Sequence, residues 1–269
     1  MSDRLLDLMV TAAIGAAEVI NEVYDGAFDA EAKADGSPVT VADQRAEALI
    51  LEALKAHPVP FLGEESVAAG HVPHLEDSFF VVDPLDGTKE FIKRNGEFTV
   101  NIALTEHRRP RRGVVLAPAT GEVFFGGPDG AFSARLDGRQ LADLRPIRVS
   151  DPDRPLRIVA SRSHGHAATR LLCEAMRVAE DVSVGSSLKF CLLAAGKAEL
   201  YPRFTPTSEW DTAAGQAVLE AAGGVVVDMD GQPLRCGHAE RRFLNPYFVA
   251  ASSLELAQRA ATEMRRLTA

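Results

Sequence analysis

A strongly apolar strand that ends in two aspartates is the feature of this sequence that most constrains its fold. A Phe-Phe-Val-Val run leads directly into Asp-Pro-Leu-Asp-Gly at 83–87. Pro84 fixes its own φ and favours extended geometry at Asp83, while Gly87 lets the chain turn. Both carboxylates and the Leu85 carbonyl can therefore converge on one point, and such oxygen ligands suit magnesium. A polar β-turn gives the same pattern, so spacing alone leaves both interpretations open.

Composition narrows the classes of function. The chain has 269 residues, of which 46% are apolar, enough for one large domain or two modest ones. A formal charge of −9 argues against a binding surface for polymeric nucleic acid. A small anionic substrate is compatible with this charge only where cations lie between it and the acidic side chains. Three widely spaced cysteines predict neither a zinc cluster nor a disulfide framework, and no apolar stretch is long enough for a transmembrane helix. We expect a cytoplasmic protein.

The first half of the chain predicts two helices followed by an antiparallel meander. Apolar residues recur at helical spacing over 3–24, and a polar loop is expected over 25–38. A second helix begins at Thr40, with Asp43 in a capping-box position, and ends at His57-Pro58. Short β-rich runs with turn residues between them cover 79–83, 98–104, 113–117, 122–125 and 131–136.

Strand and helix signals alternate in the second half. We expect strands at 157–160, 198–201 and 225–228, and helices at 167–179, 187–195 and 212–222. The chain is therefore predicted to divide near residue 151. Residues 1–150 form an α+β half with most of the candidate metal ligands, and 151–269 form an α/β half that completes the site and carries the substrate pocket. The two halves are expected to pack tightly.

Further acidic residues occupy positions that suit either chemistry or ordinary structure. Glu64 and Glu65 follow another predicted strand end, where adjacent acids commonly form a solvated loop. Asp211 stands beside Trp210 at the start of a predicted helix, where an aspartate serves well as an N-cap. Asp43 is explained structurally as an acid in the first turn of a helix.

Basic residues of the second half form a candidate anion site. Gly185-Ser186-Ser187 precedes a predicted helix and offers backbone N–H groups, with Lys189 one turn further on. A serine cap with a surface lysine explains the same residues. Arg203 and His164 could add phosphate contacts, although single basic residues commonly face solvent. The sequence contains neither a dinucleotide-binding glycine motif nor a P-loop.

Taken together, three motifs in order resemble the lithium-sensitive, magnesium-dependent phosphatases of the inositol monophosphatase superfamily. They are Gly-Glu-Glu at 63–65, Asp-Pro-Leu-Asp-Gly-Thr at 83–88 and Trp-Asp at 210–211. The resemblance extends over nearly the whole chain. It implies the α+β inositol monophosphatase / sugar phosphatase fold, a layered αβαβα sandwich.

Within this superfamily, the sequences at 87–104, 161–164, 185–191 and 200–204 resemble bacterial 3'(2'),5'-bisphosphate nucleotidases of the CysQ type. Inositol monophosphatases typically have Thr-Asn where this chain has Lys89-Glu90. The resemblance implies hydrolysis of the 3'-phosphate of adenosine 3',5'-bisphosphate to AMP and phosphate, which recycles a by-product of sulfate activation. Ser66-Val67 resembles inositol monophosphatases instead, so inositol or fructose phosphates remain alternative substrates. A non-catalytic phosphonucleotide-binding module is the alternative from another class.

The family pattern also implies roles for individual residues. Glu64, Asp83 and the Leu85 carbonyl would hold one magnesium ion, while Asp83, Asp86 and Asp211 would hold a second, with a third ion allowed. Thr88 and Asp43 would help deprotonate the attacking water, with Glu64 nearby. The implied substrate-binding residues are Glu64, Leu85, Asp86, Gly87, Thr88, His164, Ser186, Lys189, Arg203 and Asp211.

The resemblance carries expectations about the intact protein as well. It implies a small phosphorylated nucleotide as the substrate and inhibition by lithium. A homodimer and peripheral association with the inner membrane are compatible with it, although the sequence offers no basic amphipathic helix for membrane binding.

Overall fold

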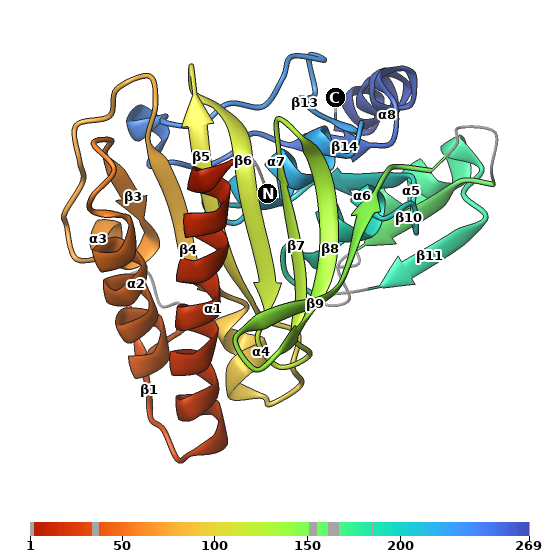
Figure 1. Cartoon of the computed structure of the whole chain (residues 1–269). Helices are drawn as coiled ribbons and strands as arrows, with labels where there is room; N and C mark the ends of the chain where they lie inside the picture. Colours follow the sequence, from red (N-terminus) through yellow and green to blue (C-terminus); the bar gives the residue numbers. More distant parts are fainter. Residues whose placement is uncertain (1–2, 34–37, 151–154, 161–166, 184, 269) are drawn as a thin grey trace.

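The fold is a stack of alternating helix pairs and sheets. The computed structural model describes residues 3–33, 38–150, 155–160, 167–183 and 185–268. A helix pair, a seven-stranded sheet, a second helix pair, a five-stranded sheet and a third helix pair follow one another, with buried apolar side chains between the layers (Figure 1). The predicted α+β class and layered αβαβα sandwich are confirmed.

The outer helix pair consists of α1 (Arg4–Asp25) and α2 (Val41–Leu54). Both were predicted, and α2 begins with the expected capping box between Thr40 and Asp43. The prediction of a loop before α2 is wrong in part, because β1 (Ala30–Ala32) pairs antiparallel with β2 (Pro38–Thr40). Three-residue strands are too short to produce a recognisable alternation in the sequence.

The seven-stranded sheet provides the rigid base of the molecule. Its strands in spatial order are β3 (Phe61–Gly63), β4 (Phe80–Asp86), β5 (Thr99–Glu106), β6 (Arg109–Ala117), β7 (Glu122–Gly127), β8 (Gly130–Asp137) and β9 (Gln140–Ile147). β3 runs parallel to β4, and the others form the predicted antiparallel meander. β9 was missed because its side chains are mostly exposed and show no alternation.

Side chains of β4 alternate between the two faces of the sheet. Phe80 and Val82 pack beneath α1 and α2, whereas Phe79 and Val81 point to the opposite face and join the second helix layer. This burial on both faces explains the continuous apolar run in the sequence.

The second half builds the five-stranded sheet and the remaining helices. They are β10 (Arg157–Ala160), α5 (Ala167–Met176), β11 (Glu180–Ser183), α6 (Leu188–Ala194), β12 (Leu200–Arg203), α7 (Ala213–Ala221), β13 (Val225–Asp228), β14 (Phe248–Ala251) and α8 (Leu254–Thr268). β11, β10 and β12 are parallel neighbours, and β14 lies antiparallel between β12 and β13. The sequence analysis missed β11, β14 and α8. A short 3-10 turn covers Ala239–Arg241.

The middle helix layer packs against both sheets. Strand residues such as Val81 and Val115 share one apolar core with Phe190 of α6 and Val218 of α7. The boundary predicted near residue 151 falls outside the described residues, so the division into two halves stays a prediction. Among the described helices, none is both long enough and apolar enough to cross a membrane.

Two glycines let α7 lie directly on the seven-stranded sheet. A Cβ atom on Gly113 would stand 2.3 Å from the Ala214 carbonyl oxygen, and one on Gly126 would stand 2.8 Å from the Ala221 Cβ. Any side chain at either position would push the helix away. This contact matters for the site because α7 follows directly after Asp211.

Replacing Gly113 with alanine should therefore destabilise the protein. We expect Gly113→Ala to lower the free energy of unfolding by about 1–3 kcal/mol, since overpacking of a close contact costs energy of this order. Urea unfolding measures it. Gly26→Ala is the matched control, because its Cβ would meet its nearest neighbours at an ordinary 3.6 Å. Equal effects of the two substitutions would show that the α7 contact is not tight.

Candidate active site

The parallel pairing of β3 with β4 brings two acidic residues together. Gly63 lies opposite Val82 in the register, so the next residues along the two strands are Glu64 and Asp83. Their side chains are close enough to share a hydrogen bond. Asp83 is only 1% exposed. Two segments about twenty residues apart in the sequence thus place their carboxyl groups side by side.

A tight turn follows Asp83. Its Oδ1 accepts a hydrogen bond from the Leu85 N–H at 2.9 Å, and the pairing of β4 with β5 shifts register between Asp83 and Asp86. Gly87 then adopts a left-handed conformation at φ 94°, and a Cβ there would stand 3.0 Å from the Glu97 carbonyl oxygen. The chain turns at Gly87 into α4 (Thr88–Ile92).

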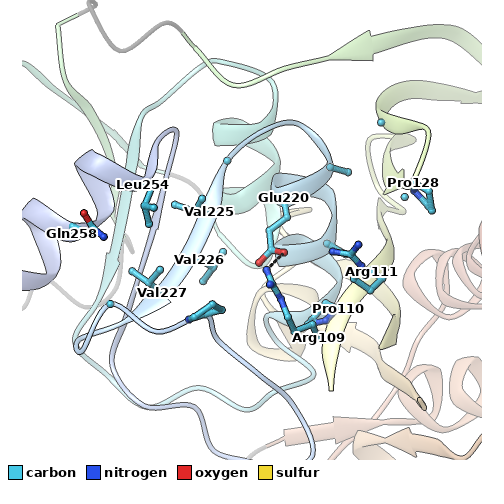
Figure 2. A pocket seen from close by; sticks show the side chains of 17 residues that line it. Arg109, Pro110, Arg111, Pro128, Glu220, Val225, Val226, Val227, Leu254 and Gln258 are labelled. Atoms are coloured by element: carbon cyan, nitrogen blue, oxygen red, sulfur yellow. Dashed lines mark hydrogen bonds and ion pairs between the residues drawn. The ribbon is translucent and has the colours of Figure 1, made fainter. Parts of the chain in front are cut away.

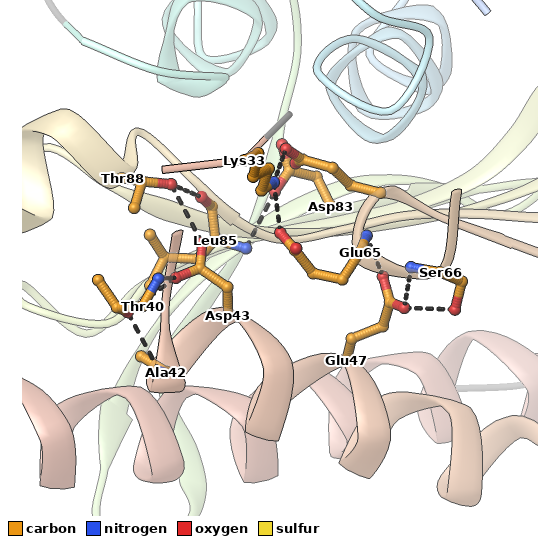
Figure 3. A network of polar contacts seen from close by, with 11 residues as sticks. Lys33, Thr40, Ala42, Asp43, Glu47, Glu65, Ser66, Asp83, Leu85 and Thr88 are labelled. Carbon is orange, nitrogen blue, oxygen red and sulfur yellow. Dashed lines mark hydrogen bonds and ion pairs between the residues drawn. The ribbon is translucent and has the colours of Figure 1, made fainter. Parts of the chain in front are cut away.

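Thr88 and Asp43 form the predicted pair. The Thr88 hydroxyl lies 3.1 Å from Asp43 Oδ1 and 3.2 Å from the Leu85 carbonyl oxygen (Figure 3). The other oxygen of Asp43 accepts from the Thr40 backbone N–H at 2.8 Å and from its hydroxyl at 2.7 Å. Burial raises the pKa of Asp43, and these donors oppose the rise. Asp43 is therefore both a member of the capping box that begins α2, with Thr40 as the N-cap, and a partner of Thr88.

The second half contributes Asp211. Its Oδ2 accepts from the Ser208 N–H at 2.9 Å, and Thr212, not Asp211, is the N-cap of α7. Its backbone carbonyl accepts from the Ser187 hydroxyl at 2.8 Å. The same hydroxyl lies 3.0 Å from Asp86 Oδ2, so Ser187 links the two aspartates across the halves.

A cavity of about 350 Å³ opens beside these aspartates. Six of the predicted substrate-binding residues line it, namely Asp86, Gly87, Ser186, Lys189, Arg203 and Asp211. The cavity is also lined by residues for which the sequence predicted no role, namely Lys89, Glu90, Lys93, Glu97, Tyr201 and Thr207. His164 lies outside the described residues. Leu85 and Thr88 do not line this cavity and belong to the adjoining network of Figure 3. Glu64 does not line it either and is paired with Lys33.

The structure does not agree with the interpretation of Ser187 and Lys189 as a serine cap followed by a surface lysine. Lys189 is not a surface lysine, because it is only 5% exposed and its Nζ donates to the Ser186 carbonyl at 2.9 Å. Burial lowers its pKa to about 8. The Ser187 N–H is not free to bind an anion, because it donates to Asp86 Oδ2 at 2.7 Å. The cationic side chains of the cavity are therefore better placed than the Ser187 N–H to bind an anion.

A second cavity, of about 660 Å³, lies at the far end of α7 (Figure 2). Its walls carry valines of β13 and an ion pair of 3.0 Å between Arg109 and Glu220. Glu220 is the single carboxylate among its described lining residues. A site with one carboxylate, itself neutralised by an arginine, is poorly suited to several divalent cations. The smaller cavity beside Asp86 is therefore the candidate active site.

Comparison with known proteins agrees with this geometry. The sequence pattern of the inositol monophosphatase family matches residues 1–269. The chain belongs to the inositol monophosphatase family. It is 45% identical over 248 residues to the 3'(2'),5'-bisphosphate nucleotidase CysQ of Escherichia coli K12, covering 91% of this chain and 98% of that protein.

Solved structures give the same result. The CysQ crystal structure from Bacteroides thetaiotaomicron, a bacterial member of the inositol monophosphatase family, matches with a TM-score of 0.76 and 38% identity, over 92% of this chain and 97% of that chain. The IMPase of Thermotoga maritima has a TM-score of 0.76 at 22% identity, over 99% of this chain and 98% of its own, and shows the shared fold.

The carboxylates of this inositol monophosphatase family member repel one another strongly. Burial raises the pKa values of Asp83, Asp86 and Asp211, and for Asp83 and Asp211 neighbouring carboxylates raise them further. The donor set, with Glu64 and the Leu85 carbonyl, consists of oxygen atoms only. Buried carboxylates at close range need compensating cations, and oxygen donors fit magnesium.

A lysine supplies part of that compensation. Lys33 Nζ lies 2.6 Å from Glu64 Oε1 and 2.7 Å from Glu65 Oε1, and its side chain is 9% exposed. The sequence analysis missed Lys33, since it stands in what looked like a polar loop. No three carboxylate, imidazole or thiol groups within the described part of the chain are already arranged around one point as metal ligands. Glu64, Asp86 and Asp211 instead contact protein donors.

Glu47 is another important residue that the sequence analysis missed. It is 5% exposed, and its oxygens accept from the backbone N–H groups of Glu65 at 2.8 Å and Ser66 at 2.7 Å. These N–H groups belong to the first turn of α3 (Glu64–Ala68). Glu47 therefore fixes the short helix that presents Glu64. In the sequence it stands four residues after Asp43, so both face the same side of α2.

Loss of the Glu47 carboxylate should weaken metal binding. We expect Glu47→Ala to lower magnesium affinity about 10- to 100-fold, as removal of a group that orients ligands commonly does. A calorimetric titration with magnesium measures the affinity. Glu52→Gln is the control, because Glu52 lies on the same helix and is exposed. A lower melting temperature with unchanged magnesium affinity would limit Glu47 to a structural role.

The raised pKa values of Asp83, Asp86 and Asp211 predict how pH affects the metal-free protein. Between the ordinary carboxyl pKa of about 4 and the raised values, the folded chain holds more protons than the unfolded chain. The contribution of these groups to the free energy of unfolding therefore falls as pH rises through this window. Magnesium should remove the penalty, so its stabilising effect should grow with pH, reaching about 2.7 kcal/mol at about 100 times its Kd.

Melting temperatures from about pH 5 to about pH 8, with EDTA and with magnesium, test this expectation. Asp211→Asn should reduce both the penalty and the gain from magnesium, since it removes one of the repelling charges. A magnesium effect that does not change with pH would contradict the assignment of these carboxylates to a cation site.

Proposed function

We propose that this protein is a magnesium-dependent 3'(2'),5'-bisphosphate nucleotidase that converts adenosine 3',5'-bisphosphate into AMP and phosphate. One observation carries the proposal: the cavity joins a cluster of carboxylates to cationic side chains, among them Lys189 and Arg203. Such a site suits a ligand with one phosphate at the cations of the carboxylate cluster and another at the basic side chains. The similarity to the 3'(2'),5'-bisphosphate nucleotidase CysQ of Escherichia coli supports the same activity.

The proposed metal ligands follow from the donor set. Glu64, Asp83 and the Leu85 carbonyl would hold one magnesium ion, and Asp83, Asp86 and Asp211 a second. Magnesium at these positions supplies positive charge against the scissile phosphate and lowers the pKa of the attacking water. Glu64 Oε1 is paired with Lys33 at 2.6 Å, so its other carboxylate oxygen would be the one to serve as the ligand.

Thr88 and Asp43 are proposed to move the proton. The Thr88 hydroxyl can donate to Asp43 while its oxygen accepts from the water that attacks phosphorus. The Thr40 N–H and hydroxyl hold the opposite oxygen of Asp43, so the carboxylate keeps its orientation toward Thr88. The backbone N–H groups of Gly87 and Thr88 would face the scissile phosphate.

The second phosphate and the nucleoside are proposed to contact Ser186, Lys189 and Arg203, with His164 as a further candidate. Arg203 Nε donates to the Thr205 carbonyl at 3.2 Å, which fixes the guanidinium in place. Since the pKa of Lys189 is about 8, this side chain remains a cation at neutral pH. A bound phosphate would favour the charged form further.

Two alternatives remain weaker. Ser66 resembles inositol monophosphatases in sequence, but its hydroxyl donates to Glu47 at 2.5 Å and does not line the cavity, so it carries no information about the substrate. A non-catalytic nucleotide-binding module would have no use for the paired Thr88 and Asp43. Lithium inhibition and a homodimer are proposed from the family resemblance only, and a cytoplasmic location is proposed from the cysteine content.

Phosphate release tests the proposal. The substrates are adenosine 3',5'-bisphosphate, inositol 1-phosphate and fructose 1,6-bisphosphate, each with magnesium and with EDTA. We expect magnesium-dependent release with clear preference for the first. Asp86→Ala and Asp211→Ala should each lower kcat at least about 100-fold by removing a ligand, whereas the exposed Glu52→Gln should not. Preference for a sugar phosphate, or full activity of either aspartate variant, would overturn the corresponding part of the proposal.

A further inference from the structure

We propose that Lys89 and Lys93 contact the second phosphate of the substrate and make the enzyme prefer a bisphosphate to a monophosphate. This inference rests on the proposed nucleotidase function. Both lysines line the cavity together with Lys189 and Arg203. They therefore add two positive charges to the proposed binding site.

The position of the two lysines follows from α4. Thr88 is the first residue of this short helix, and Lys93 is its C-cap. Residues four apart lie on the same side of a helix, so Lys89 and Lys93 project together. Lys89 directly follows Thr88 of the proposed proton relay, so the same short helix carries both the relay residue and the two lysines.

Both lysines are available to a ligand. They are exposed, and within the described residues neither Nζ forms an ion pair with a carboxylate. Lys33 and Lys55 behave differently, since each is paired with a glutamate. A lysine that has no carboxylate partner loses no ion pair when a phosphate binds.

The charge balance of the cavity favours a ligand with several negative charges. Four cationic side chains line it, and so do the four acids Asp86, Glu90, Glu97 and Asp211. Two of these acids, Asp86 and Asp211, belong to the proposed metal ligands. When metal ions compensate them, the remaining lining has a surplus of positive charge, which a second phosphate with about −1.5 to −2 charges would match.

The lysines also come from a different wall than the other cations. Lys89 and Lys93 belong to the first half of the chain, and Lys189 and Arg203 belong to the second half. Lys189 is buried, whereas Lys89 and Lys93 stand at the exposed rim. A phosphate between them would contact both walls, and a monophosphate held at the carboxylate cluster would leave the rim lysines unused.

Two nucleotides that share the nucleoside and the scissile phosphate test the inference. KM is measured for adenosine 3',5'-bisphosphate and for adenosine 3'-monophosphate with Lys89→Ala, Lys93→Ala and the double variant. Each single substitution should raise KM for the bisphosphate about three- to fivefold, and the double variant about tenfold or more, as expected for partly exposed ion pairs. KM for the monophosphate should rise by less than half of these factors. Lys89→Arg should restore most of the loss.

Lys55→Ala is the control, because Lys55 is an exposed lysine at the end of α2 and does not line the cavity. Equal increases of KM for both nucleotides, or none for either, would overturn the inference while leaving the nucleotidase function intact. Wild-type protein that releases no phosphate from either nucleotide would instead contradict the proposed function. Calorimetric binding of both nucleotides to magnesium-loaded Asp43→Asn protein, with and without the lysine substitutions, does not depend on turnover and decides the role of the lysines in that case.

Discussion

The structure depends on holding several carboxylates together against their mutual repulsion. Asp83 is buried, and Asp86 and Asp211, which lie far apart in the sequence, both raise its pKa. Folding alone gains nothing from such a cluster, because desolvated like charges oppose the compact state. The layered scaffold around it must therefore supply the stabilisation, through the apolar cores on both faces of the seven-stranded sheet. The rigid packing of the surrounding layers thus keeps these carboxylates together despite their repulsion, in a position where cations could bind them.

The residues of the candidate site come from the ends of strands and the starts of helices. The ends of β3 and β4 present the acidic residues, because parallel neighbours finish at the same edge of the sheet. The start of α2 provides Asp43, and the start of α4 provides Thr88. The second half adds Asp211 and the basic side chains of the cavity. The glycines under α7 matter for this reason, since they keep the second half close enough for Ser187 to link Asp86 with Asp211.

Much of this arrangement could be predicted from the sequence. The turn after Asp83 follows from proline and glycine geometry, and the cap at Asp43 follows from its spacing to Thr40. Other features could not be predicted, because they depend on residues distant in sequence. In the sequence, Glu47 and Lys33 look like ordinary surface charges. In the fold, β3 places α3 beside Glu47 of α2, and the segment before α2 places Lys33 beside Glu64 of α3. The exposed strand β9 lacks the alternation that identifies a half-buried strand, so the meander was predicted one strand too short.

The double contact of Asp43 has a further consequence for the evolutionary retention of this site. Residues at reaction centres commonly occupy strained positions, so that losing them makes a protein more stable. Here the carboxylate opposite Thr88 also completes the first turn of α2, and a capping interaction of this kind contributes about 1 kcal/mol. Asp43→Ala, which removes the proposed proton acceptor together with the acceptor for Thr40, would weaken the helix as well. Evolution therefore cannot gain stability by replacing this aspartate with a residue that is inactive. The stability of the fold itself favours keeping Asp43.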